Sequence, residues 1–307
     1  MAPCYINFFL NLVTLFGLLT LFSKGETSRV PKVNVNGVEL FYKESGSGAE
    51  TIVFSHGLLM DHSMFEAQRA AFEERYRVIA YDHRGQGESR NSGKDPGQAR
   101  DMETLTIDAA ALIQTLDAAP CHFAGLSMGG FIGLRLAARH SALVRTLTLM
   151  NTGPDREPWP GRLRYSFLAG LVWMVGVKPF TGTAMNALFG ETTRQNPDQR
   201  PMLEEWREKL RRHPRSIARA VTGVMTRREV TPDELRSIAC PTLIIAGEDD
   251  TAQPPFRSER LASFINGSRL ARIPGCGHSS SLEAAQAVSQ AMQELIKNPQ
   301  TQQQIVG

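Results

Sequence analysis

A serine lies between glycines in Gly125-Leu126-Ser127-Met128-Gly129, which has the pattern G-x-S-x-G. An apolar run with the composition of a strand precedes it, and a segment with helical spacing of apolar residues follows it. Small residues around such a serine let the chain turn sharply from strand to helix and hold the hydroxyl at the carboxyl edge of a sheet. The pattern predicts that Ser127 is a nucleophile.

A serine hydroxyl is a weak nucleophile until an imidazole takes its proton and a carboxylate orients that imidazole. His278 is the favoured base, because it follows the last predicted strand and therefore lies at the same sheet edge as Ser127. His56 and His83 also follow predicted strands, and position alone does not exclude them. The remaining histidines, expected to be surface or packing residues, are His62, His122, His140 and His213.

The expected acid follows the penultimate strand in Gly247-Glu248-Asp249-Asp250, which gives the chain order serine, aspartate, histidine. Spacing alone does not separate Asp249 from Asp250. A tetrahedral intermediate also needs two donors aimed at its oxyanion. The candidates are the backbone amide of Met128, which follows the serine, and that of Leu58, which follows the early strand at residues 51–55.

Strand ends at one edge of a parallel sheet are needed to bring these residues together. Short apolar runs predict strands, and longer segments with apolar residues at i, i+3 and i+4 predict helices between most of them. Asn36-Gly37 predicts an antiparallel hairpin over residues 33–42. The order is that of a doubly wound α/β domain, with a mostly parallel sheet covered by helices on both faces. We expect strands at 51–55, 77–81, 121–124, 144–150, 241–246 and 268–273, and helices at 61–75, 102–118, 128–139, 255–264 and 281–297.

The alternation of strands and helices stops over residues 153–232, which have helical patterns only. We interpret this segment as a helical cap inserted into a core of residues 30–152 and 233–297, with a polar tail at 298–307.

Two parts of the cap differ in composition. Residues 168–177 are nearly all apolar, whereas residues 204–228 are rich in Arg and Lys. The favoured interpretation is a buried helix followed by a solvated one. The alternative is an apolar pocket for an acyl group and a surface that attracts anions.

The N-terminal residues 5–22 contain no charged side chain, and the first cations, Lys24, Arg29 and Lys32, come after this run. A run of this length just reaches that of a membrane-spanning helix, and the charge order favours an anchor within residues 1–23 with a cytoplasmic body. Two alternatives stay open. A cleaved signal would give an exported protein, and an unused upstream start would give a cytoplasmic one.

Composition excludes several classes of protein. The 307 residues are 42% hydrophobic and 21% charged with a net charge of +3, which indicates a globular chain and argues against nucleic acid as a partner. We expect no metal and no cofactor, because the sequence has no ligands with the spacing of a zinc site. The sequence does not indicate the oligomeric state. The four cysteines, Cys4, Cys121, Cys240 and Cys276, form no C-x-x-C pair. We interpret Cys276 as a structural residue rather than a nucleophile.

Because of these motifs, residues 30–297 resemble the α/β-hydrolase fold enzymes with a helical cap, particularly carboxylesterases and the enol-lactonase-like group. In that family the acid stands at the fourth position of G-x-x-D-x-x-x-P, so the resemblance selects Asp250, which is followed by Pro254. The motifs that carry the resemblance, in the family's order, are His56-Gly57, the D-x-R-G-x-G-x-S loop at 82–89, the G-x-S-x-G segment, the Asp250 loop, and Gly275-Cys276-Gly277-His278 with Leu282-Glu283.

A serine in the nucleophile position forms an acyl ester, whereas the dehalogenases and epoxide hydrolases of this fold use an aspartate and form an alkyl ester. We therefore predict a serine hydrolase that cleaves a small apolar carboxylic ester or lactone with Ser127, His278 and Asp250. Two enzymatic alternatives with the same triad stay open, namely hydrolysis of carbon–carbon bonds and cofactor-free perhydrolysis. A non-enzymatic alternative is a module that binds a small molecule or lipid.

Overall fold

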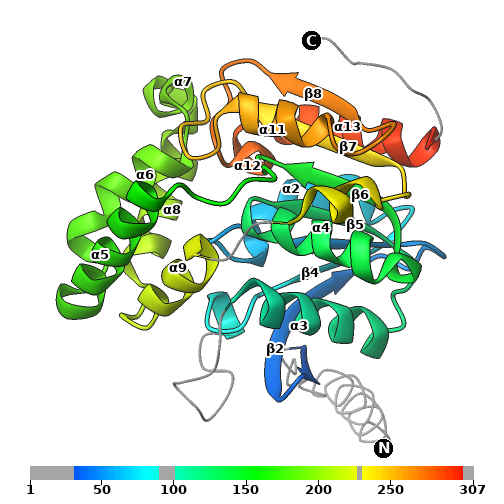
Figure 1. The fold of residues 1–307 in the computed structure, drawn as a ribbon, viewed down its shortest axis with the longest axis horizontal. Coiled ribbons are helices and arrows are strands. Elements are labelled where there is room, and N and C mark those ends of the chain that lie inside the picture. The colour runs from blue at the N-terminus through cyan, green and yellow to red at the C-terminus, as the bar shows by residue number, and fades with distance from the viewer. Residues whose placement is uncertain (1–30, 90–100, 227–229, 300–307) are drawn as a thin grey trace, which may run out of the picture. The chain divides into compact units, whose positions relative to one another are not determined.

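The computed structural model describes residues 31–89, 101–226 and 230–299. Within them, eight strands form one sheet in the order β1-β2-β4-β3-β5-β6-β7-β8 (Figure 1). The pairs β1–β2 and β2–β4 are antiparallel, and every later pair of neighbours is parallel. This topology confirms the predicted doubly wound α/β class and the mostly parallel sheet. The strands are β1 Lys32–Val35, β2 Val38–Ser45, β3 Thr51–Ser55, β4 Arg77–Tyr81, β5 Cys121–Leu126, β6 Val144–Met150, β7 Thr242–Gly247 and β8 Arg269–Ile273.

The predicted hairpin is present between β1 and β2, where Val35 pairs with Val38. The two residues between them have φ values of 44° at Asn36 and 76° at Gly37. Asparagine and glycine tolerate positive φ, which a two-residue turn requires, so the turn follows from the local sequence.

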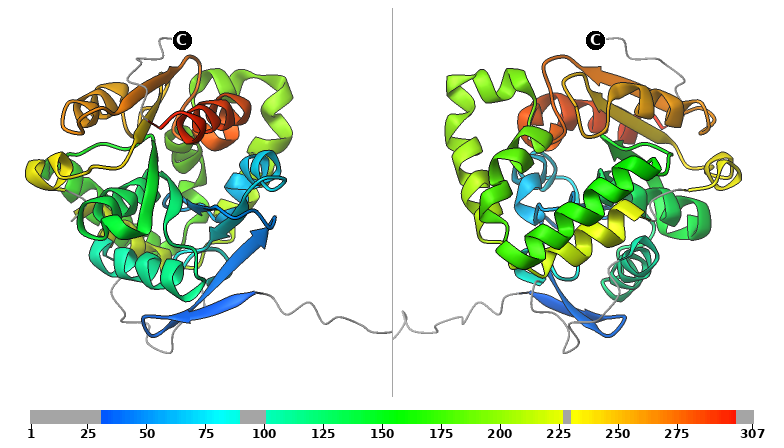
Figure 2. Two further views of the ribbon diagram at one scale, coloured as in Figure 1. Left: turned by 90° about the vertical axis from the view of Figure 1, so that its right-hand side faces the viewer. Right: turned by 60° about the vertical axis from the view of Figure 1, so that its left-hand side comes forward.

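Helices cover both faces of the sheet (Figure 2). On one face, α3, α4 and α11 share an apolar core with residues such as Val53 and Phe123. On the other face, α2 and α13 pack on residues such as Ile52 and Phe54. The alternation of Ile52, Val53 and Phe54 between the two cores is the two-residue period of a strand buried on both sides. These helices are α2 Glu66–Phe72, α3 Met102–Thr115, α4 Met128–Arg139, α11 Pro255–Ala262 and α13 Ala285–Lys297.

Two predicted helices are interrupted in the structure. The helix predicted at 61–75 begins with a short 3-10 turn, η1 His62–Phe65, because the Asp61 side chain accepts from the amide of Ser63 and caps that turn. The helix predicted at 281–297 is divided into α12 Ser280–Glu283 and α13, because Ala284 leaves helical geometry with φ −136° and ψ 47°.

Between β6 and β7 the described residues form helices and turns and no strand. We call residues 153–232 the cap segment, keeping the boundaries that the sequence predicts. Helix α10, which begins at Pro232 with Thr231 as its N-cap residue, carries the chain from the end of the cap segment back to β7. The elements of this region are α5 Trp159–Val175, η4 Lys178–Phe180, α6 Thr181–Leu188, α7 Glu191–Gln195, η5 Pro197–Gln199, α8 Arg200–Arg211, α9 Ile217–Thr226 and α10 Pro232–Arg236.

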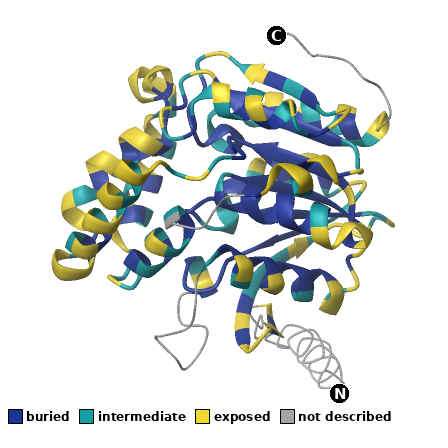
Figure 3. Ribbon diagram, in the orientation of Figure 1, coloured by how far each residue is buried: buried dark blue, intermediate teal, exposed yellow. Residues whose placement is uncertain are grey.

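The favoured interpretation of the cap segment as one buried helix followed by one solvated helix is wrong. In α5, Ala169 and Val172 are buried, but Phe167 and Met174 are 71% and 61% exposed. Much of this helix is coloured as exposed in Figure 3. The basic region is divided into α8 and α9, and α9 packs against α5. Composition did not reveal this arrangement, because α5 is apolar around most of its circumference and only neighbouring helices decide which side is covered.

The described residues contain no helix long and apolar enough to cross a membrane. The predicted anchor or signal at residues 5–22 lies outside the described residues, as do residues 300–307 of the predicted tail.

Candidate active site

Ser127 lies between β5 and α4 in a backbone conformation with φ 50° and ψ −105°. Its amide donates to the carbonyl of Met150 at 2.8 Å, which holds the turn to the end of β6. Glycines make this turn sterically feasible. A Cβ at Gly125 would lie 2.2 Å from the carbonyl oxygen of Gly129, and a Cβ at Gly129 would lie 2.0 Å from that of Ser55. The G-x-S-x-G pattern therefore reflects close backbone packing on both sides of the serine.

His278 and Asp250 form a hydrogen-bonded pair, with the imidazole Nδ1 2.8 Å from the carboxylate Oδ2. Both residues are buried, at 5% and 3% exposure. Because an ionised carboxylate only accepts hydrogen bonds, Nδ1 carries the proton and Nε2 is left as an acceptor. The backbone amides of Ala252 and Gln253 also donate to Asp250, each at 2.8 Å, and fix the carboxylate. The loop after β7 thus holds the acid in one orientation.

The neighbouring Asp249 points elsewhere. Its carboxylate accepts from the hydroxyl of Thr192 at 2.6 Å and from the Thr192 amide at 3.2 Å. Of the two aspartates that spacing left open, the structure brings Asp250 to His278 and places Asp249 against α7.

Ser127, His278 and Leu58 line one cavity of about 180 Å³. Its other walls are mainly apolar side chains of α5, α6 and α9, among them Leu168, Val172 and Val221. No acidic side chain of the described residues lines it. The cavity therefore suits an apolar group placed next to the serine hydroxyl.

The two backbone amides predicted to bind the oxyanion lie in segments that follow adjacent strands of the sheet. β3 and β5 are parallel neighbours in which Ser55 pairs with Gly125, so the loop that contains Leu58 and the turn that leads to Met128 leave the sheet side by side. Met128 is the first residue of α4, where backbone amides have no acceptor within the helix. Both amides thus belong to segments that meet at the carboxyl edge of the sheet.

His56 and His83 lie beneath this edge, fully buried, and hold the loops together. The His83 amide donates to Nε2 of His56 at 3.0 Å, so His56 carries its proton on Nδ1 and donates to the carbonyl of Gly57 at 2.7 Å. The imidazole of His83 is 3.1 Å from the hydroxyl of Ser55. Burial lowers the pKa of His56, and burial together with His56 holds the pKa of His83 well below its ordinary value. Their contacts give both histidines structural roles.

His62 was expected to be a surface or packing residue, but it forms a specific ion pair. Its Nδ1 lies 3.0 Å from Asp82 Oδ1, and its amide donates to the same carboxylate at 2.6 Å. Burial alone lowers the pKa of His62, but the hydrogen bonds and charge of Asp82 outweigh burial and raise the pKa above its ordinary value. The pair joins η1 to the loop at 82–89.

The sequence motifs did not predict Asn151, although it lies in the candidate site. It follows β6 with φ 51°, and its side-chain amide donates to Asp250 Oδ2 at 2.9 Å and to the Gly277 carbonyl at 3.0 Å. Its position directly after a predicted strand is the signal that could have identified it.

The motif resemblance includes Glu283 but predicts no role for it. Its carboxylate accepts from the amides of Gly190, Gly277 and Ser279 at 2.8 to 3.0 Å. The side chain therefore ties the His278 loop to the cap segment.

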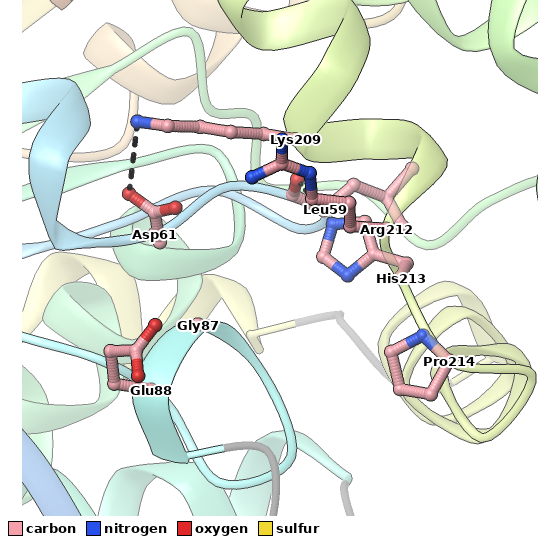
Figure 4. Close-up of a pocket in the computed structure, with 8 residues that line it drawn as sticks. All are labelled: Leu59, Asp61, Gly87, Glu88, Lys209, Arg212, His213 and Pro214. Atoms are coloured by element: carbon pink, nitrogen blue, oxygen red, sulfur yellow. Dashed lines mark hydrogen bonds and ion pairs between the residues drawn. The ribbon is translucent and has the colours of Figure 1, made fainter.

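A second, polar cavity of about 170 Å³ lies between α8 and the core (Figure 4). Leu59 lines both cavities. His213 Nε2 donates to the Leu59 carbonyl at 2.9 Å, and Lys209 Nζ lies 3.9 Å from Asp61. Burial raises the pKa of Asp61, but the Ser63 hydroxyl and then Lys209 outweigh burial, and the pKa is lowered. The cap segment is thus fastened to the core beside Leu58.

Cys276 is 2% exposed, and burial, followed by the charges of Glu283, Asp250 and Asp249, raises the pKa of its thiol. A neutral thiol is a poor nucleophile, which agrees with the structural interpretation. Within the part of the chain that the structure describes, no three His, Cys, Asp or Glu side chains are grouped to hold a metal ion.

Comparisons with known proteins extend these observations. A family model described as "Alpha/beta hydrolase family" matches residues 52–291. The chain is 30% identical over 259 residues to the AB hydrolase superfamily protein YisY of Bacillus subtilis, which covers 82% of this chain and 93% of that protein. A thermophilic esterase from Thermogutta terrifontis has a TM-score of 0.80 and 28% identity, with 88% of this chain and 100% of that one covered. The enol-lactonase from Burkholderia xenovorans LB400 has a TM-score of 0.78 and 28% identity, with 87% and 100% covered.

Proposed function

Since this chain belongs to the alpha/beta hydrolase family, we propose that it is a serine hydrolase that cleaves carboxylic esters or lactones through an acyl-enzyme intermediate. The observation that carries the proposal is the buried Asp250–His278 pair, whose histidine lines one mainly apolar cavity together with Ser127. Similarity to an esterase and an enol-lactonase supports the choice of esters and lactones.

In the proposed reaction, the Ser127 hydroxyl attacks the substrate carbonyl carbon while Nε2 of His278 accepts its proton. Asp250 keeps His278 in the required tautomer and stabilises the imidazolium that forms. The amides of Leu58 and Met128 donate to the oxyanion. The imidazolium then protonates the leaving alkoxide, and water repeats the cycle on the acyl ester.

The cavity indicates the kind of substrate. Its walls next to the serine are apolar, so hydrocarbon groups on the acyl or alkyl side gain by leaving water. Serine forms an ester with the acyl group, and water hydrolyses such an ester in the second half of the cycle. Small apolar esters and lactones therefore suit both the apolar walls of the cavity and the proposed chemistry of Ser127.

The test is hydrolysis of p-nitrophenyl esters from acetate to palmitate by the full chain in mild detergent. We expect turnover that falls by roughly ten-thousandfold or more in Ser127→Ala, because the nucleophile and base act as a unit. Ser141→Ala, an exposed serine in η3 Ser141–Leu143, is the matched control and should retain full turnover. Circular dichroism of each variant verifies the fold.

A fluorophosphonate probe separates an enzyme from a binding module. It should label wild-type protein at Ser127 and leave Ser127→Ala unlabelled. Equal ester turnover by wild type and Ser127→Ala would overturn the proposal. A folded, labelled wild type without turnover on any ester or lactone would move the assignment to carbon–carbon or perhydrolase chemistry, and an unlabelled one to a binding module.

A further inference from the structure

Helix α5 presents apolar side chains on two opposite sides. Leu168, Ala169 and Val172 line the cavity that contains Ser127. On the outer side, large hydrophobic residues are exposed to solvent, and much of α5 is coloured as exposed in Figure 3. Six of the eight large exposed hydrophobic residues of the described chain lie on this one helix. They are Trp159, Leu163, Phe167, Trp173, Met174 and Val175, and the other two are Ile107 and Phe256.

Four of these side chains lie along one face of the helix, and we call them the outer stripe: Trp159, Leu163, Phe167 and Met174, with exposures of 70%, 61%, 71% and 61%. Their spacing of four, four and seven residues matches the helical repeat, so they share one face. At 1.5 Å per residue the stripe is about 22 Å long. Apolar patches of this kind on a soluble surface mark sites of interaction.

The charges around the stripe indicate its partner. α5 contains no acidic residue, and two exposed cations lie near it: Arg164 within the helix, where it also borders the cavity, and Lys178 three residues past its end. The two acids that precede the helix are both paired with cations, Glu157 with Arg257 at 3.2 Å and Asp155 with the exposed Arg260 at 3.4 Å. An apolar stripe flanked by cations and without acids is complementary to a bilayer with anionic headgroups.

The rest of the sequence agrees with this partner. Residues 5–22 form an uncharged apolar run that is followed by Lys24 and Arg29, the pattern that predicts membrane association of the chain. A second copy of the chain would bury the stripe equally well, but it gives no reason for the cations beside it.

We propose that the outer stripe of α5 docks on the surface of an anionic lipid bilayer, with the helix lying in the plane of the interface. The inner side of the same helix then forms the wall of the cavity, so an apolar substrate dissolved in the membrane has a short path to Ser127. Docking does not depend on the proposed reaction and is measured without turnover.

Tryptophan fluorescence provides the direct test. The chain has three tryptophans and none within residues 1–31, so quenching reports on the folded body however the N-terminus binds. Trp159 is 70% exposed on the stripe, Trp173 is 47% exposed on the same helix, and Trp206 is 2% exposed. The full chain is mixed with vesicles of phosphatidylglycerol and phosphatidylcholine that carry brominated acyl chains, which quench tryptophan on contact.

We expect bromolipid to quench the wild-type emission and Trp159→Phe to lose most of that quenching. Trp206→Phe, the matched control at a buried position, should retain it. Vesicle-bound protein without quenching, quenching that Trp159→Phe does not change, or absence of vesicle binding would each overturn the proposal. A concentration-dependent dimer that shields Trp159 without lipid would assign the stripe to a second copy instead.

A second pair of variants tests the consequence for substrate access. Phe167→Ser should lower hydrolysis of an ester embedded in vesicles by roughly tenfold, since removing one buried aromatic weakens interfacial partitioning by that factor. Hydrolysis of a water-soluble ester should be unchanged, because Phe167 does not line the cavity. Ile107→Ser, on α3 and 52% exposed, is the control and should affect neither rate.

Discussion

The side-chain amide of Asn151 donates to the same carboxylate oxygen of Asp250 that is paired with His278. The distances to Asp250 Oδ2 are 2.9 Å from Asn151 Nδ2 and 2.8 Å from His278 Nδ1. Asn151 donates also to the carbonyl of Gly277, the residue before His278. One amide therefore holds both the acid and the loop of the base, and the proposed triad depends on a fourth side chain.

Removing this amide should reduce turnover without unfolding the protein. Asn151→Gly keeps the positive φ of 51° accessible and deletes the two hydrogen bonds. We expect kcat to fall about tenfold or more, because a hydrogen bond to a charged group contributes about 1.5 to 3 kcal/mol. Asn151→Ala should show the same kinetic loss together with lower stability in urea. Unchanged kcat in Asn151→Gly would show that Asp250 is adequately held by backbone amides alone.

Ser127 occupies a strained conformation, with φ 50° and ψ −105°. Such a residue costs about 1 to 3 kcal/mol when it carries a Cβ. Ser127→Gly should therefore be more stable than Ser127→Ala by about 1 kcal/mol, although glycine also gains entropy in the unfolded chain. Urea unfolding of the two inactive variants measures the difference. Equal midpoints would mean that the surrounding turn stores no strain.

Gly129 and Gly170 are both helical glycines, but their surroundings differ. A Cβ at Gly129 would lie 2.0 Å from the Ser55 carbonyl oxygen, whereas nothing lies within 4 Å of one at Gly170. Gly129→Ala should lose about 1 to 3 kcal/mol of stability and most activity, because α4 must move away from β3. Gly170→Ala should gain about 0.5 to 1 kcal/mol, because alanine favours helix. Similar changes in both unfolding curves would contradict the packing argument.

His213 connects the cap segment to the loop of the proposed oxyanion donor. It donates to the carbonyl of Leu59, which follows Leu58 and has φ 67°. We expect His213→Ala to lower kcat by roughly fivefold with little change in KM, in line with the loss of one neutral hydrogen bond of about 1 kcal/mol. His213→Gln, which retains a donor, should recover part of kcat. A rise in KM alone would indicate a role in substrate binding rather than in positioning the loop.

Stability should fall on acidification below about pH 6.5. Burial lowers the pKa of His56, and the pKa of His83 lies well below its ordinary value, so both stay neutral in the folded protein while the unfolded chain takes up protons. Each depressed pKa contributes stability that is present above pH 6.5 and lost below it. His62 has the opposite sign: its raised pKa contributes stability that is complete below 6.5 and lost as pH rises through the folded value.

Urea unfolding between neutral pH and about pH 5 measures these slopes. Each neutral buried histidine adds up to about 1.4 kcal/mol per pH unit to the acid-side slope. His83→Gln should reduce the slope by about one proton, and His140→Gln, at an exposed position, should leave it unchanged. An identical slope in His83→Gln and wild type would show that His83 is protonated in the folded state.

Local chemistry explains which features could be predicted. Strands β3, β4 and β6 occupy the expected residues, because short apolar runs bounded by polar residues have one stable arrangement in a covered parallel sheet. The turn at Ser127 was predictable for a similar reason, since its glycines relieve clashes within one short segment. His278 could be favoured as the base because the end of a strand determines the sheet edge at which the next loop lies.

The features that local patterns did not predict depend on contacts between segments that are far apart in the sequence. Asn151 and Asp250 are 99 positions apart, and they meet because β6 and β7 are neighbours in the sheet. The separation of Asp249 from Asp250 depends on how one loop turns, which spacing along the chain does not encode. The exposure of the outer stripe of α5 depends on which side α9 covers.

The sequence by itself determined the order of strands and helices, the strained serine turn and the set of residues able to act as nucleophile, base and acid, because each follows from a local pattern. The resemblance selected Asp250 as the acid, but only the tertiary structure shows its hydrogen bond to His278, the support from Asn151 and the open apolar side of α5. Those relationships are contacts between distant segments, and their free energy depends on the register of the sheet and the packing of helices rather than on the identity of neighbours along the chain.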